Sequence, residues 1–248
     1  MAETDAVETT GKSAGKIARI VGIVVVAGLI LLAIIASMTA KPDYSAQVWD
    51  ERTTIGSLEA KNYYVMYTDI ACPYCDVFTR LTIENKDKFE QFIADNDILF
   101  EVRVTDYLYM AHKDLQYSRD SAEGVYCAKR EDRFWDYYHA AVQSLWNDYQ
   151  SHGFGASKTA PPIKGMPDDY WLQVGHKVGL GETFDNCMKN DEALTELDAD
   201  TEKAITSLTK VGAGMPYFQI NKWTQDGFDN TWSWAMVEQY LKAGLEKR

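Results

Sequence analysis

Hydrophobic residues form one long unbroken run near the N-terminus and many shorter, patterned runs after it. The long run is residues 20–40, IVGIVVVAGLILLAIIASMTA, which carries no charge. At about 1.5 Å per residue, a helix of this length spans roughly 30 Å, the thickness of the hydrocarbon core of a bilayer. The apolar region of a cleaved signal peptide is shorter, about 7–15 residues, and ends at small residues, whereas Met38 lies near the end of this run. We therefore predict a retained transmembrane anchor over residues 20–40, with a cleaved signal peptide as the alternative.

The charges that flank the anchor predict its orientation. Lys12, Lys16 and Arg19 precede the run, whereas only Lys41 follows it closely. Because positive charge collects on the cytoplasmic side of a membrane, the N-terminus is expected in the cytoplasm. The bulk of the chain then lies outside the cytoplasm as the exposed part of a single-pass protein of a bacterial cell membrane.

Four segments follow from this reading. Residues 1–19 are polar and lack an apolar period, as is typical of a disordered cytoplasmic tail. Residues 20–40 are the anchor, residues 41–59 form a short juxtamembrane connector, and residues 60–248 form the globular domain.

The globular domain begins with the pattern of a βαβ unit. Residues 63–67, YYVMY, predict a buried strand, and residues 98–104, ILFEVRV, predict another. Between them, the spacing of Val77, Phe78 and Leu81 favours a helix. Strand, helix and strand in this order predict two parallel strands with a right-handed crossover.

Helical patterns then dominate from about residue 107 to residue 210. Phe134, Tyr138, Val142 and Trp146 recur every four residues, which predicts an amphipathic helix with an apolar stripe. We read this stripe as core rather than as a substrate-binding surface. The pattern further predicts a loop over residues 151–167, helices over 168–190 and 192–208, a strand over 216–220, a turn at 221–222 and a last helix over 232–246. The prediction is thus an α/β domain interrupted by a helical insert.

Composition and charge narrow the possible functions. A chain of 248 residues suits one or two domains, and a hydrophobic content of 46% is enough for a core. The formal net charge is −12, and the residues after Lys41 carry about −13. A general nucleic-acid-binding protein needs a basic face, so we expect no nucleic-acid partner. The chain has four cysteines, Cys72, Cys75, Cys127 and Cys187, which allow three pairings into two disulfides.

The motif Cys72-Pro73-Tyr74-Cys75 carries the clearest chemical signal. Its spacing places the two sulfurs one helical turn apart, and it lies between the predicted strand and the predicted helix. Pro73 then occupies the first helical position, where its missing N–H costs nothing. Free backbone N–H groups and the positive end of the helix dipole favour a thiolate at Cys72, with Cys75 as the buried partner. A stabilised thiolate is a good leaving group, which suits thiol–disulfide exchange.

Two other interpretations of this motif are weaker. A CxxC pair can be half of a zinc site, but the chain has no second CxxC, and its four histidines show no ligand spacing. We therefore expect no metal. A purely structural disulfide is the other alternative, and it would not require the strand–CPxC–helix setting.

The segment Gly214-Met215-Pro216-Tyr217-Phe218 supplies the second signal. Together with the CxxC motif, it resembles the thioredoxin superfamily, in which a cis-proline opens the strand opposite the cysteines. The resemblance implies that Pro216 is this cis-proline and that Met215 is its variable predecessor. In the family, the backbone beside the proline pairs with an extended substrate segment, a form of β-augmentation. The alternative is an ordinary trans proline at the start of a strand.

The spacing of the two motifs separates the subfamilies. CPYC alone resembles glutaredoxin, but there and in thioredoxin the cis-proline follows the cysteines by a few tens of residues. Here Pro216 lies 141 positions after Cys75, and the extra residues are helical. A helical domain inserted into a thioredoxin fold resembles DsbA. The resemblance covers roughly residues 60–247 and rests on TDIACPYCDVF, the helical insert and GMPYF together.

The resemblance implies further roles for individual residues. DsbA-like proteins of some Gram-positive bacteria have a second, structural disulfide in the insert, which implies a Cys127–Cys187 bond, with two free thiols as the alternative. Tyr74, Met215 and Tyr217 are expected to form an apolar, substrate-binding rim around Cys72. Tyr74 stands where the best-known DsbA proteins have His, and this dipeptide tunes the oxidising strength.

Our functional hypothesis is a membrane-anchored dithiol oxidase that transfers the Cys72–Cys75 disulfide to reduced exported proteins. The resemblance implies reoxidation by a DsbB-like or vitamin-K-epoxide-reductase-like membrane protein, and no cofactor. The first alternative is a reductase or isomerase with the same site, although DsbC-like isomerases add a dimerisation domain for which residues 41–59 are too short. The second is a peptide-binding or chaperone module in which the cysteines are merely structural.

Overall fold

The computed structural model describes residues 49–157, 159–211, 214–221, 223–225, 228 and 231–246. The predicted cytoplasmic tail, the predicted anchor over residues 20–40 and residues 41–48 of the predicted connector lie outside these residues. Within the described part, none of the helices combines the length and the apolar character needed to cross a bilayer.

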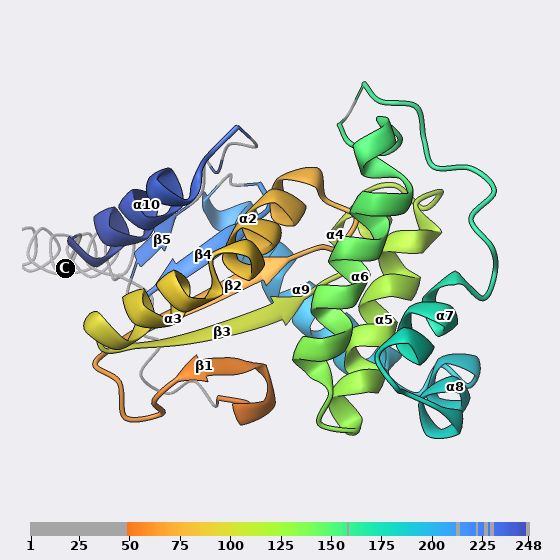
Figure 1. Ribbon diagram of the computed structural model, residues 1–248, viewed down its shortest axis with the longest axis horizontal. Coiled ribbons are helices and arrows are strands. Elements are labelled where there is room, and N and C mark those ends of the chain that lie inside the picture. The colour runs from red at the N-terminus through yellow and green to blue at the C-terminus, as the bar shows by residue number, and fades with distance from the viewer. Residues whose placement is uncertain are drawn as a thin grey trace, which may run out of the picture. The chain divides into compact units, whose positions relative to one another are not determined.

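A five-stranded mixed sheet forms the centre of the domain (Figure 1). Its spatial order is β1-β3-β2-β4-β5. The strands are β1 (Thr54–Gly56), β2 (Asn62–Thr68), β3 (Ile98–Val104), β4 (Tyr217–Ile220) and β5 (Trp223–Gln225). Strands β2 and β3 are parallel, which confirms the predicted βαβ unit, and the other three pairs are antiparallel. The central strand β2 therefore has β3 on one side and β4 on the other, although β4 follows it by about 150 positions.

Alternate residues of β2 face two different layers, as the pleat of a strand requires. Tyr64 and Met66 lie in the main core, to which α2 (Pro73–Glu84), α3 (Lys86–Asp95) and α10 (Trp234–Glu246) contribute. Val65 and Tyr67 lie in a second cluster with residues of α9 (Leu194–Val211). Figure 1 shows α2 and α3 in front of the sheet and α9 behind it. The sheet is thus buried on both faces, which explains the continuous apolar run of β2.

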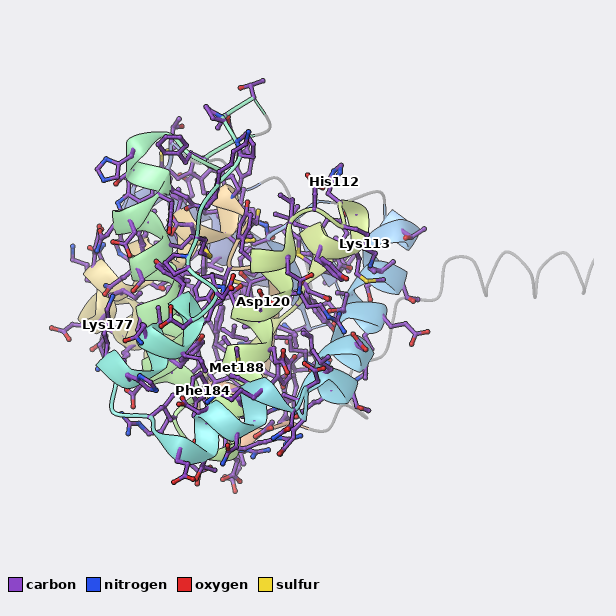
Figure 2. The ribbon with its side chains drawn as sticks, turned by 90° about the vertical axis from the view of Figure 1, so that its right-hand side faces the viewer. His112, Lys113, Asp120, Lys177, Phe184 and Met188 are labelled. Atoms are coloured by element: carbon purple, nitrogen blue, oxygen red, sulfur yellow. A yellow bond between two sulfur atoms is a disulfide. The ribbon has the colours of Figure 1, made fainter. Side chains whose placement is uncertain are left out.

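The helical insert lies beside the sheet (Figure 1). Its members are α4 (Tyr107–Ala111), α5 (Gln116–Arg130), α6 (Phe134–Asp148), α7 (Tyr170–Lys177) and α8 (Glu182–Lys189), and α9 leads back to the sheet. A disulfide between Cys127 and Cys187 joins α5 to α8. Figure 2 views this side of the molecule, with Phe184 and Met188 of α8 drawn below Asp120 of α5.

The structure refines the predicted elements in three places. The helix expected over residues 168–190 is two helices, α7 and α8, because the chain turns between them at Gly179 with a positive φ of 82°. Helix α3 and strand β5 were not predicted. The apolar stripe of α6 is buried at three of its four positions, whereas Trp146 is half-buried with the Arg80 guanidinium 3.7 Å from its ring centroid.

Candidate functional site

Cys72 and Cys75 lie at the junction of β2 and α2. Cys72 has an extended backbone conformation and is the N-cap of α2, and Pro73 is the first helical residue. The Cys72 N–H donates to the Asp69 carbonyl oxygen at 3.0 Å, which forms a turn between strand and helix. Cys75 follows inside the first turn of α2. Both cysteines are free thiols, with Cys72 5% exposed and Cys75 1% exposed. Only Cys72 therefore borders the surface.

Strand pairing brings the Met215–Pro216 segment to these cysteines. Tyr67 of β2 pairs with Tyr217 of β4, so the residues just before β4 lie next to the residues just after β2. The Met215–Pro216 peptide bond is cis, and the Met215 carbonyl oxygen lies 3.8 Å from the Cys72 sulfur. The structure thus brings together Cys72, Cys75 and Pro216, the three residues expected to be catalytic, the cysteines from their motif and Pro216 from the resemblance.

The surroundings of Cys75 disfavour its thiolate. Burial raises the pKa of Cys75 well above its ordinary value, and the neighbouring Cys72 sulfur raises it further. The Asp69 backbone and the Thr68 side chain act on this pKa in the opposite direction. Cys72 therefore borders the surface, whereas Cys75 is a buried thiol that is protonated at neutral pH.

Asp69 is a structural component of the site that the sequence did not single out. Its carboxylate accepts hydrogen bonds from the Ala71 N–H, the Leu108 N–H and the Ser118 hydroxyl, each at 2.8 Å. The side chain is fully buried, and this burial raises the pKa of Asp69 to about 6. Asp69 therefore ties the turn before Cys72 to α4 and α5. The signal in the sequence is an Asp two residues before a turn N–H, the pattern of an Asx-turn.

A second buried carboxylate, Asp76, follows Cys75 directly. Burial raises the pKa of Asp76 to about 6, although the Arg80 guanidinium beside it acts in the opposite direction. Arg80 Nε donates to Asp76 Oδ2 at 2.8 Å. The other oxygen, Oδ1, is buried and has no hydrogen-bond partner within the described residues.

The residues predicted to form an apolar rim do not all lie on the surface. Tyr74 is exposed and Met215 is half-buried, so both are accessible beside Cys72. Tyr217 is 1% exposed and packs with Val65 and Leu208 in the second cluster. Its side chain is therefore part of the core and not of the rim, because the strand pleat turns it toward α9.

The helical insert also contacts the active-site turn through Gln150. This residue lies in a short 3-10 turn, Gln150–His152, after α6. Its side-chain Nε2 donates to the Ala71 carbonyl oxygen at 3.5 Å. Its side-chain Oε1 is buried and has no hydrogen-bond partner among the described residues. No local pattern predicts this contact, since it joins segments about 80 positions apart.

The remaining two cysteines lie outside the CxxC motif and are bonded to each other. Cys127 and Cys187 form the disulfide between α5 and α8, with Cα atoms 5.8 Å apart. In the part of the chain that the structure describes, acidic, histidine and cysteine side chains form no cluster that could hold a metal ion. Cys72 and Cys75 give the site a dithiol pair in which only the Cys72 sulfur borders the surface.

A family model described as Thioredoxin matches residues 49–240. None of the curated proteins matches the sequence. Several solved structures share the fold. BdbD from Bacillus subtilis has 16% identity and a TM-score of 0.55, with 84% of this chain and 97% of that chain covered. MdbA, a thiol-disulfide oxidoreductase from Corynebacterium diphtheriae, has 15% identity and a TM-score of 0.54, with coverage of 82% and 92%. The thiol-disulfide exchange protein alpha-DsbA2 from Wolbachia pipientis has 16% identity and a TM-score of 0.52, with coverage of 83% and 92%.

Proposed function

The chain belongs to the thioredoxin family and has its DsbA-like form, and on that premise we propose that it is a thiol–disulfide oxidoreductase working as an oxidase. It donates the Cys72–Cys75 disulfide to reduced exported proteins. The observation that supports this most directly is the asymmetry of the two sulfurs. Cys72 borders the surface at the N-terminus of α2, and Cys75 is buried with a raised pKa.

This asymmetry determines which of the two sulfurs a substrate thiolate attacks. A substrate thiolate can reach only the Cys72 sulfur, because Cys75 is enclosed. Attack forms a bond between the substrate sulfur and Cys72, breaks the Cys72–Cys75 bond and leaves the electron pair on Cys75. A second substrate thiolate then attacks the first substrate sulfur, and Cys72 leaves as a thiolate. The substrate ends oxidised and the enzyme ends as a dithiol. The positive end of the α2 dipole favours negative charge on the departing Cys72 sulfur.

The cis-proline segment supplies the surface on which a substrate chain is held. The Met215 carbonyl oxygen lies beside the Cys72 sulfur, so a peptide bound along this segment presents its own cysteine to Cys72. Backbone pairing of this kind accepts many sequences, because it uses groups that every residue has. Tyr74 and Met215, which are both accessible near Cys72, add apolar contacts.

The cellular setting completes the proposal. The uncharged run over residues 20–40 anchors the protein in the membrane, with the catalytic domain outside the cytoplasm. A DsbB-like or vitamin-K-epoxide-reductase-like membrane protein reoxidises the dithiol, and the shared membrane raises the effective concentration of both. The Cys127–Cys187 disulfide is structural, and the redox cycle needs no cofactor.

The test is the reduction potential of the Cys72–Cys75 pair in the full chain, equilibrated with glutathione buffers. Mass spectrometry of alkylated peptides follows this pair and the Cys127–Cys187 pair separately. An oxidase should have a potential well above the roughly −270 mV of thioredoxin, with only the CxxC pair reduced in this range. A potential at or below that of thioredoxin would replace the oxidase with a reductase.

A further inference from the structure

A groove of about 680 Å³ lies between α4 and α9. Met110 of α4 belongs to one wall, and Lys113, which Figure 2 labels, lies at its edge. Glu202 and Ile205 of α9 belong to the other wall. The groove is distinct from the site described above, because Cys72 is not part of its lining.

The walls of the groove carry apolar side chains that remain accessible to solvent. Met110 is 44% exposed, and none of the five residues of α4 is buried, although the sequence of this helix is YLYMA. Ile205 on the opposite wall is half-buried. Lys113 and Glu202 add exposed charges of opposite sign. An apolar centre with polar groups around it is the arrangement of a surface that binds protein.

The groove is continuous with the cis-proline segment. Tyr107 of α4, Leu208 of α9 and Met215 pack in the same second cluster. Met110 follows Tyr107 by three positions and Ile205 precedes Leu208 by three. Each of the two therefore lies about one turn further along the same face of its helix, away from the cluster. A substrate chain held at the cis-proline segment can thus continue into the groove.

Hydrogen bonds and ion pairs hold the two walls in place. The Thr201 hydroxyl of α9 donates to the Asp106 carboxylate at 2.7 Å and accepts from the Asp106 N–H at 3.2 Å. Arg119 of α5 forms ion pairs with Asp106 and, at 2.9 Å, with Asp198 of α9. These contacts join the start of α4 to α5 and α9. Because the groove is preformed, binding costs little ordering of the protein.

The dimensions of the groove suit an extended peptide. Its α9 wall runs from Asp198 to Thr206, which at about 1.5 Å per residue is roughly 12 Å. A chain in extended conformation covers this distance with about four residues. A stable interface with a folded partner or with a second copy of this chain needs about 20–30 residues on each side, far more than line this groove.

We propose that the groove between α4 and α9 binds an extended, apolar segment of the substrate protein, next to the substrate cysteine that reacts with Cys72. The inference rests on the proposed function and adds a subsite to it. Backbone pairing at the cis-proline segment accepts any sequence, whereas Met110 and Ile205 favour apolar residues near the cysteine. Folded proteins bury such residues, so the groove favours chains that have not yet folded.

The experiment measures how fast two thiol substrates reduce the oxidised full-length protein. One is glutathione, which is too short to reach the groove, and the other is an unstructured dicysteine peptide with about four apolar residues on each side of its cysteines. Met110→Glu/Ile205→Glu places a charge on each wall. We expect this double variant to need a roughly tenfold higher peptide concentration for half-maximal rate, with an unchanged maximal rate, because it loses binding and not chemistry. Its rate with glutathione should match that of the wild type.

Leu58→Glu/Met236→Glu is the matched control. Leu58 and Met236 are 47% and 45% exposed outside the groove, so this variant adds the same charge at apolar residues of similar exposure. It should react with the peptide like the wild type. A peptide rate of Met110→Glu/Ile205→Glu within twofold of the wild type overturns the groove, as does an equal loss in the control. A wild-type dimer in sedimentation that the groove variant cannot form would assign the groove to a second copy and also overturn the proposal. A wild-type protein that reacts with neither thiol substrate would instead overturn the proposed function.

Discussion

Removing the disulfide between Cys127 and Cys187 should cost the protein much of its stability. The bond closes a loop of 60 residues between α5 and α8. In the chain-entropy model a loop of this length stabilises the folded state by about 4 kcal/mol, because it restricts the unfolded chain. Domains of this size have a total free energy of unfolding of only about 5–15 kcal/mol.

The elements that the disulfide joins have few other means of holding their position. Helix α8 has only eight residues, too short to be stable without packing. Its main buried contact is Phe184, whose ring lies 5.2 Å from that of Tyr137 and also fills the space beside Gly175. Both sulfurs are buried, so the double variant Cys127→Ala/Cys187→Ala loses core volume in addition to the covalent bond.

Urea unfolding at equilibrium separates these two effects. Two proteins are compared with the disulfide-bonded wild type: the double alanine variant, and the wild type in which the Cys127–Cys187 bond is reduced. The reduced wild type gives the contribution of the bond alone. We expect the free energy of unfolding of the reduced wild type to be about 3–5 kcal/mol lower than that of the disulfide-bonded wild type. A matched variant, Cys72→Ala/Cys75→Ala, should lose far less, because its ring closes over only four residues. A loss below about 1 kcal/mol in the reduced wild type would refute the loop argument.

Three further outcomes follow from the site. In the reduced protein at pH 7, iodoacetamide should modify Cys72 and leave Cys75 unmodified, because Cys75 is buried and its pKa is raised; peptide mapping that finds equal labelling would contradict this. Asp69→Ala should lower the free energy of unfolding by about 3 kcal/mol, since it leaves two buried donors and one half-buried donor without an acceptor; a urea midpoint equal to that of the wild type would count against it. His139 has its pKa lowered to about 4 by burial, so between pH 6.5 and pH 4 the unfolded chain binds a proton that the native chain excludes. As the pH falls through that window, the free energy of unfolding of the wild type should therefore drop by up to about 3 kcal/mol relative to that of His139→Gln, measured by urea unfolding at each pH. A difference in free energy of unfolding that stays constant with pH would exclude this titration.

The parts of this structure that were predictable have local signals in the sequence. The run before Cys72 predicts a buried strand, and Pro73 predicts where the helix begins, because each depends only on neighbouring residues. The parallel pairing of β2 and β3 follows from the order of elements. The resemblance to the DsbA-like fold, not the spacing alone, selected Pro216 and the Cys127–Cys187 pairing.

The groups that were missed depend on contacts across the fold. Helix α3 is amphipathic, with Phe89, Phe92 and Ile93 buried, but its other positions are so polar that the pattern was not recognised. Tyr217 was assigned to the surface because it adjoins Pro216, whereas the pleat of β4 turns its side chain into the second cluster. Tyr138 was correctly read as core, but its hydroxyl meets Thr79 across two helices, which no spacing reveals.

The helical insert is therefore part of the redox site and not only an addition to the thioredoxin core. Leu108 of α4 and Ser118 of α5 hold the Asp69 carboxylate that fixes the turn before Cys72. Gln150 contacts the same turn, and the Tyr138 hydroxyl of α6 lies 2.6 Å from that of Thr79 in α2. Changes that move α6 relative to α2 should accordingly alter the rate of thiol exchange even where no residue touches a substrate. Because the insert holds the turn before Cys72, its sequence can tune the exchange without altering the CxxC motif.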